Sequence, residues 1–237
     1  MIFLTRLTAQ RPAEGMGIRC AIYQGERPVG TPAALQDNLA RLDEIVREAK
    51  KCDVQLISFP ELYLEGYTLT PALLQQLAEP VDGPSIARVA AIAKAHHLSI
   101  ICPYAERDDT GEAVRYYDAI AVLSAEGVLL HNYRKTHLFG QAERANYAFG
   151  YADGTEDPFC VSRVAGFPVG VLNCYEAEFP ELSRILALRG ARLIVMPTAD
   201  YYYTLPDGRR THVPYSDVIH TLRRFPGKIL PPRCPPP

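Results

Sequence analysis

The chain has 237 residues, of which 48% are hydrophobic and 22% charged, and its formal net charge at pH 7 is −2. This length and composition are those of an ordinary globular protein, so we expect one main domain built around a substantial core. Acidic and basic residues are interspersed, and no basic stripe could follow a phosphate backbone. We therefore expect no nucleic-acid partner.

No apolar run approaches the roughly 20 residues of a membrane span, and residues 1–4 are too few for the core of a signal peptide. The expectation is therefore a cytoplasmic protein without a membrane partner. The six cysteines form no CxxC pair and no cluster with histidine, which indicates neither a metal site nor a redox centre.

Segments with helical and strand periodicity alternate along the chain. Residues 1–16 show no clear period and are expected to form a mobile leader. Helices are predicted over residues 32–50, 84–97 and 180–188, and strands over residues 18–23, 54–59, 98–104, 119–123, 128–132, 159–164, 169–173 and 193–196. Residues 124–127 predict a hairpin turn in which Gly127 takes positive φ. The interleaving of the two kinds of element indicates an α/β fold with a mixed sheet.

The end of the chain has a different composition. Residues 215–222 could begin a helix, whereas residues 223–237 contain six prolines. Proline lacks the backbone N–H that a helix interior or a central strand requires, so this Pro-rich tail is expected to be irregular or extended. The main domain is accordingly expected over residues 17–222.

Three reactive side chains each follow an apolar strand. Glu61 follows Phe59-Pro60, Lys135 follows the strand at 128–132, and Cys174 follows the strand at 169–173. A free thiol has a pKa of ~8.5, so little of it is thiolate near neutral pH and it needs a base nearby. A thiol, a carboxylate and an ammonium together provide a nucleophile, a base and a cation for an oxyanion. Taken alone, each also has an ordinary structural interpretation: a packed thiol, or a solvated charge at a strand end.

The residues around these three side chains carry a resemblance. Glu61 is followed by Gly66-Tyr67, Lys135 lies in Tyr-Arg-Lys-Thr-His-Leu-Phe-Gly at 133–140, and Cys174 begins Cys-Tyr-Glu-Ala-Glu-Phe-Pro-Glu at 174–181. In these contexts the chain resembles the nitrilase superfamily of carbon-nitrogen hydrolases, over roughly residues 18–203. Glu176 stands where members commonly have Asp.

The resemblance implies a four-layer αββα sandwich, here without part of the usual C-terminal region. It also implies a catalytic triad of Glu61 as general base, Lys135 as oxyanion partner and Cys174 as nucleophile, acting without a cofactor or a metal. The backbone N–H of Tyr175 would be the second oxyanion donor. Glu143, eight residues after Lys135, would position the substrate or the attacking water.

Two further features concern the substrate. Glu178 resembles a residue of members that act on amides of amino-substituted acids, where a carboxylate would suit a cationic amine; a surface carboxylate at a helix start is the alternative. Residues 201–203, Tyr-Tyr-Tyr, would line the mouth of the site or simply pack. His137 is expected to be structural.

The resemblance therefore implies hydrolysis of a small linear carboxamide, with an ω-amino amide as one form, through a cysteine thioester. An N-carbamoyl amine or a nitrile is the alternative substrate, and Tyr175 argues against the nitrile because nitrilases generally carry Trp there. An inactive scaffold, or a glutamine-fed ammonia supplier without its synthetase domain, are the remaining alternatives. The resemblance also implies a homo-oligomer that pairs through the helix at 180–188.

Overall fold

The computed structural model describes residues 12–24, 30–67, 69–151 and 157–199, together with the backbone of residues 202–204 and 210–212. The chain divides into two units at residue 199. In the second unit, β9 (Tyr202–Thr204) pairs antiparallel with β10 (Arg210–His212). The predictions for residues 1–11, for the helix at 215–222 and for the tail at 223–237 lie outside the described residues, as does the side-chain role given to residues 201–203.

The first unit contains a five-stranded sheet. Its strand order is β1 (Cys20–Ile22), β2 (Leu56–Ser58), β3 (Ser99–Asp108), β4 (Arg115–Leu123) and β5 (Leu129–Arg134). The pairs β1–β2 and β2–β3 are parallel, and the pairs β3–β4 and β4–β5 are antiparallel. Two reversals of direction make β5 run parallel to β2, so both strands end at the same edge of the sheet.

A second, three-stranded sheet has the order β6 (Ser162–Val164), β7 (Phe167–Val171) and β8 (Leu193–Val195). Residues of both sheets form one buried apolar cluster, which includes Leu56 and Ile101 of the first sheet and Val169 and Val171 of the second. The two sheets therefore pack face to face.

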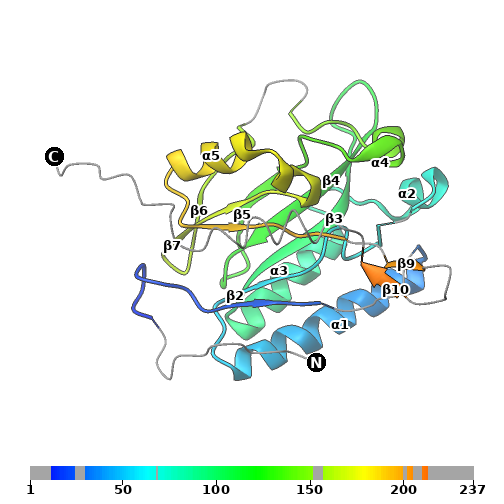
Figure 1. Cartoon of the computed structure of the whole chain (residues 1–237). Helices are drawn as coiled ribbons and strands as arrows, with labels where there is room; N and C mark the ends of the chain where they lie inside the picture. The colour runs from blue at the N-terminus through cyan, green and yellow to red at the C-terminus, as the bar shows by residue number, and fades with distance from the viewer. Residues whose placement is uncertain are drawn as a thin grey trace. The chain divides into compact units, whose positions relative to one another are not determined.

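Helices cover the outer faces of the two sheets. The helices α1 (Pro32–Lys51) and α3 (Pro84–His96) pack on the first sheet, and α5 (Pro180–Leu188) packs on the second through Leu182 and Leu186. The layers thus follow the order helix, sheet, sheet, helix, and the four-layer αββα sandwich is confirmed (Figure 1). The shorter helices α2 (Pro71–Leu77) and α4 (Gly140–Asn146) lie at the strand ends.

The helix boundaries follow local sequence chemistry. α1 begins after Thr31, whose hydroxyl accepts a hydrogen bond from the Ala34 N–H at 3.0 Å, and Pro32 occupies its first turn. α3 begins with Pro84 and ends at His97, whose φ of 47° lies in the left-handed region. The predicted hairpin turn is confirmed, since Gly127 has a φ of 79° between β4 and β5.

Two elements are longer than predicted and two helices were not predicted. β3 continues to Asp108 and β4 begins at Arg115, because the polar residues at these ends pair with each other across the two strands. The two unpredicted helices are α2 and α4, and the mainly polar α4 buries its Glu143. The end of the predicted leader contains a turn, in which the Met16 N–H donates to the Ala13 carbonyl at 3.0 Å.

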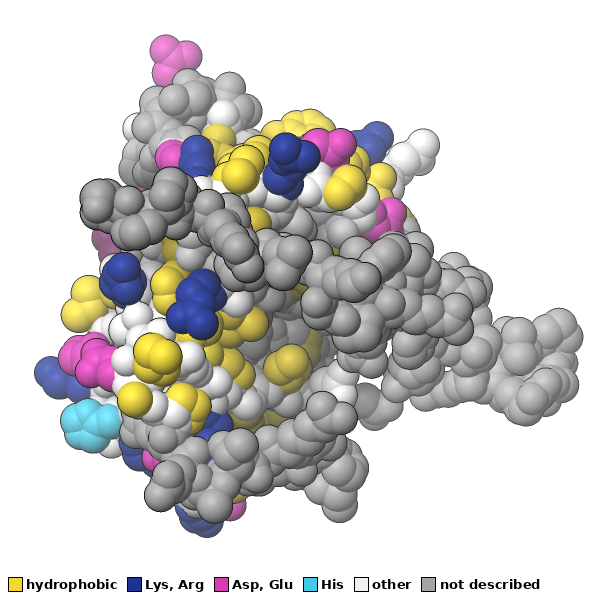
Figure 2. Space-filling model, turned by 60° about the vertical axis from the view of Figure 1, so that its left-hand side comes forward, with side chains coloured by type: hydrophobic (Ala, Val, Ile, Leu, Met, Phe, Trp, Pro, Cys, Tyr) yellow, Lys and Arg dark blue, Asp and Glu magenta, His cyan; other side chains and the backbone are white. Residues whose placement is uncertain are grey.

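The described surface has mixed charge. Figure 2 shows Lys and Arg side chains interspersed with Asp and Glu side chains on one face of the molecule. Among the described residues, no helix has the length and apolar character needed to cross a bilayer.

Candidate active site

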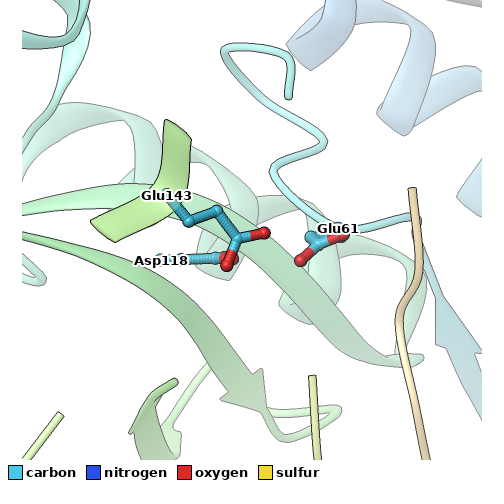
Figure 3. A group of neighbouring side chains, drawn as sticks. All are labelled: Glu61, Asp118 and Glu143. Atoms are coloured by element: carbon cyan, nitrogen blue, oxygen red, sulfur yellow. The ribbon is translucent and has the colours of Figure 1, made fainter. Parts of the chain in front are cut away.

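Lys135 is buried at the end of β5 and is surrounded by carboxylates. Its Nζ lies 2.5 Å from Glu61 Oε1, 3.2 Å from Asp118 Oδ2 and 2.9 Å from Glu143 Oε2. Glu61 comes from the loop after β2, Asp118 from β4 and Glu143 from α4, and all three carboxylates are buried and point toward one another (Figure 3). An ammonium group has three N–H donors, and here each acid provides an acceptor.

This acidic cluster defines the electrostatics of the site. Oxygens of the three acids lie within 4.8 Å of one another, a spacing that would also suit a metal ion, but the Lys135 ammonium bonds to all three and takes the central position. Burial alone would lower the pKa of Lys135, yet the three carboxylates outweigh it and raise that pKa. Burial raises the pKa of Asp118 well above its usual range, and Lys135 only partly offsets this. Lys135 is therefore held as a cation.

Cys174 follows β7 and begins the 3-10 helix η1 (Cys174–Glu178). Its φ of 50° lies in the left-handed region, which costs a non-glycine residue about 1–3 kcal/mol. The Cys174 N–H donates to the Pro197 carbonyl at 2.8 Å, which fixes this turn against the segment after β8. The backbone therefore holds the half-buried thiol at the end of the strand rather than letting it pack into the core.

The pKa of the Cys174 thiol is raised above its ordinary value. Burial is the main cause, and the charge of Glu61 and a hydrogen bond with Glu61 add to it, whereas Lys135 lowers it. The resting thiol is therefore neutral. The Glu61 carboxylate contacts Lys135 at 2.5 Å, and its charge also acts on the Cys174 thiol.

Glu176 fastens the Cys174 segment to the Lys135 segment. Its Oε2 accepts hydrogen bonds from the Asn173 N–H at 2.8 Å and from the Tyr133 hydroxyl at 2.6 Å. Its Oε1 accepts from the Thr136 N–H at 2.7 Å and from the His137 N–H at 3.1 Å. A buried carboxylate with this many donors is fully satisfied, so Glu176 has a structural role beside the site.

Glu143 belongs to the same group of charges as the predicted triad. Besides Lys135, its carboxylate accepts hydrogen bonds from the Tyr67 hydroxyl at 2.5 Å and from the Phe139 N–H at 2.7 Å. The structure thus brings Glu143 to the site. Its role toward substrate or water stays a prediction.

The other two predicted substrate residues lie on η1. The half-buried ring of Tyr175 packs edge-on against Phe139 and Phe179, with centroid distances of 5.2 and 5.1 Å. Glu178 ends the same short helix, and its Oε1 is buried without a hydrogen-bond partner among the described residues. A buried acceptor without a donor is uncommon.

Several residues of the site were not predicted from the sequence. Asp118 directly precedes the apolar run 119–123, and an acidic residue at that position was the one available signal. Gly150 supports Lys135 by donating its N–H to the Lys135 carbonyl at 2.8 Å. A Cβ atom at position 150 would lie 2.3 Å from the Arg134 carbonyl oxygen, so the close approach requires glycine.

Comparison with known proteins gives several relatives. A protein of Pseudomonas protegens described as "Hydrolase in pqqF 5'region" is 40% identical over 183 residues, which cover 77% of this chain and 60% of that protein. An "(R)-stereoselective amidase" of a Pseudomonas species is 33% identical over 144 residues, covering 61% of this chain and 48% of the relative. The chain therefore spans about half to three fifths of the length of these two relatives.

Solved structures also match. A mutant amidase from Nesterenkonia sp. AN1, described as showing Michael addition of acrylamide at its active-site cysteine, superposes with a TM-score of 0.62 at 27% identity. The match covers 77% of this chain and 67% of that one. The family model described as "Carbon-nitrogen hydrolase" matches residues 19–225. Because that match includes the whole αββα sandwich, the chain belongs to the carbon-nitrogen hydrolase family, the nitrilase superfamily.

Proposed function

We propose that the protein hydrolyses a small linear carboxamide to the carboxylic acid and ammonia through a thioester on Cys174. One observation carries this proposal. The buried Glu61 carboxylate contacts the Lys135 ammonium at 2.5 Å, and the charges of both groups act on the Cys174 thiol, raising and lowering its pKa respectively. The amidases among the matched proteins support the same reaction class.

The acylation step follows from this arrangement. Cys174 Sγ attacks the amide carbon while Glu61 takes the thiol proton, and the carbonyl oxygen becomes an oxyanion. The Lys135 ammonium stabilises that oxyanion through its charge, and the backbone N–H of Tyr175 donates a hydrogen bond to it. Glu61 then returns the proton to the amide nitrogen, the C–N bond breaks, and ammonia leaves.

Deacylation repeats the same chemistry with water. Glu61 takes a proton from a water molecule, whose oxygen attacks the thioester carbon. The C–S bond breaks, the proton returns to sulfur, and the carboxylic acid is released. Glu143, which also bonds Lys135, is placed to orient that water.

The substitution Glu61→Gln is expected to lower the amidase rate by about 10²- to 10⁴-fold, because the general base is lost. It should also make Cys174 easier to alkylate. The charge of Glu61 raises the thiol pKa and Lys135 lowers it, so removal of that charge shifts the midpoint of iodoacetamide labelling to lower pH. The measurement is the labelling rate of Cys174 as a function of pH, followed by peptide mass spectrometry.

Glu65→Gln is the matched control, because Glu65 is a buried acid whose carboxylate accepts a hydrogen bond from the Ala105 N–H rather than from Lys135. Its labelling midpoint should stay near that of the unsubstituted protein. An unchanged or higher midpoint in Glu61→Gln would contradict the contact between Glu61 and Cys174.

Among linear amides, an ω-amino amide is the second candidate substrate, and it is favoured by the buried Oε1 of Glu178, which has no hydrogen-bond partner in the part of the chain that the structure describes. A terminal ammonium could supply the missing donor. The test compares ammonia release from 5-aminopentanamide and from pentanamide. Glu178→Gln should reduce kcat/KM for the amino amide by about tenfold, as expected for one lost charged hydrogen bond, and leave pentanamide within about threefold.

Glu181→Gln, which changes an exposed acid of α5, is the control for that comparison. Equal losses on both amides would exclude a role of Glu178 in recognising the amine.

The alternative substrates give different products. An N-carbamoyl substrate would release carbon dioxide together with ammonia, and a nitrile would be converted to the acid and ammonia without release of a free amide. No ammonia from any amide, with no labelling of Cys174, would indicate the inactive scaffold.

A further inference from the structure

Asp118 joins the two halves of the site. It is fully buried, and its side chain makes one contact on each side: Oδ2 lies 3.2 Å from Lys135 Nζ, and Oδ1 accepts from Asn173 Nδ2 at 2.8 Å. Its backbone carbonyl also accepts the Lys135 N–H at 2.9 Å. One residue of β4 thus bonds both the backbone and the ammonium of Lys135 and the residue that precedes Cys174.

Asn173 transmits this contact to the nucleophile. It is fully buried and is the last residue before the left-handed turn at Cys174. A side chain fixed at Asn173 therefore restricts where the thiol points. The carboxylate of Asp118 lies between the oxyanion partner on one side and the base of this turn on the other.

We propose that Asp118 is a positioning residue that sets the placement of the Lys135 ammonium relative to the Cys174 thiol through its simultaneous bonds to Lys135 and Asn173. The inference rests on the proposed function for its role in the reaction. Catalytic groups must be held close to their productive geometry, and a displacement of about 1 Å can cost 10²-fold in rate. Asp118 acts in this scheme through its contacts with Lys135 and Asn173.

Two uncharged substitutions of Asp118 separate the effect of its side-chain contacts from the effect of its negative charge. Asp118→Ala removes both side-chain contacts. Asp118→Asn removes the same charge but can still bond both partners, because an amide carries a donor and an acceptor and the Asn173 amide can turn over to match it. Any difference between the two variants therefore reports the contacts and not the charge.

The experiment measures kcat and KM of the full chain on a linear amide. Asp118→Ala is expected to lower kcat by about 10- to 100-fold with KM within about threefold, and Asp118→Asn to return kcat to within about threefold of the unsubstituted protein. Gln55→Ala is the control, since Gln55 is also buried and joins two segments, through the Arg19 N–H at 3.1 Å, but lies before β2. It should leave kcat within about threefold.

A double substitution tests the coupling. If Asp118 acts partly through Asn173, the loss in the Asp118→Ala/Asn173→Ala pair is smaller than the product of the two single losses. The proposal is overturned if the losses multiply, if Asp118→Ala keeps kcat within threefold, if it loses no more than Gln55→Ala, or if Asp118→Asn is no better than Asp118→Ala.

Labelling of Cys174 by iodoacetamide gives a readout that needs no substrate. Lys135 lowers the pKa of the thiol, so Asp118→Ala, which releases Lys135, should be labelled at least about threefold more slowly than Asp118→Asn. If the protein hydrolyses no amide but shows this difference, the proposed function fails and the positioning role stands. Equal labelling rates overturn the positioning role, whatever the activity.

Discussion

Replacement of Cys174 by alanine is expected to abolish amide hydrolysis, with a loss of at least about 10⁴-fold in the rate of ammonia release. In the proposed mechanism the thiol is the nucleophile, because it lies just after β7 and is subject to the charges of Glu61 and Lys135. Hydroxamate formation in the presence of hydroxylamine should disappear with it, because hydroxylamine intercepts the thioester. Both products are measured on the purified variant.

Cys20→Ala provides the control for this substitution, because Cys20 is an exposed cysteine on β1, an edge strand of the five-stranded sheet. It should keep full activity. If Cys174→Ala kept more than about one tenth of the rate, the covalent mechanism would be wrong, since cysteine nucleophiles are not replaced by the residual groups of their sites.

Lys135→Met is expected to damage both activity and stability. Activity should fall by about 10²- to 10³-fold, the cost of losing one group that stabilises the oxyanion. The free energy of unfolding should fall by about 3–5 kcal/mol at pH 7, because three buried carboxylates lose the cation that bonds them all. Urea titration of both proteins measures the second effect.

The stability loss in Lys135→Met should grow with pH. The pKa of Asp118 is already raised by burial, and Lys135 is the partner that lowers it, so the substitution raises it further. A carboxyl group whose folded-state pKa lies above its unfolded value of ~3.9 favours the folded state at low pH and loses that contribution as pH rises. The deficit should therefore be larger at pH 8 than at pH 5.

Lys51→Met is the contrasting control for stability. Lys51 forms an exposed ion pair with Glu48 at 2.7 Å, and pairs of this kind contribute about 0–1 kcal/mol. Its removal should change the free energy of unfolding by no more than that. If the Lys135→Met protein were as stable as Lys51→Met at every pH, Lys135 would not stabilise the three buried carboxylates around it.

Periodicity in the sequence predicts most of the sandwich. The apolar stripe of α1 and the short apolar strands β2 and β7 are buried on one or both faces, so hydrophobicity alone reveals them. The end of β3 and the start of β4 do not show this apolar pattern, because their polar side chains pair with residues that are distant in the sequence. Glu106 on β3, for example, pairs with Arg134 on β5 at 2.6 Å.

The candidate site also contains residues that local sequence suggests and residues that only the structure reveals. Glu61, Lys135 and Cys174 are candidates from the sequence because each follows a strand in a recognisable local context. Asp118 and Glu176 cannot be assigned in that way, since their roles exist only through contacts such as Asp118 with Asn173, 55 residues away, and Glu176 with Thr136, 40 residues away. Likewise, the φ of 50° at Cys174 has no signature in the sequence.

Some predictions from the sequence stay predictions. They are the homo-oligomer formed through α5, the cytoplasmic location, the absence of a nucleic-acid partner and the division into leader, domain and tail. On α5, Leu188 is 71% exposed, which is compatible with a contact there. Sedimentation of the full chain would measure its oligomeric state.

The covalent step can be observed directly. The protein is mixed with a simple linear amide, quenched in acid within the first turnovers, digested, and its peptides are weighed. We predict an added acyl mass on the peptide that contains Cys174, which is absent from Glu61→Gln under the same conditions and is removed by hydroxylamine. The contradicting result would be ammonia release that keeps pace with substrate loss while no acyl mass is found at Cys174 and no hydroxamate forms with hydroxylamine. That result would exclude the thioester and with it the proposed reaction.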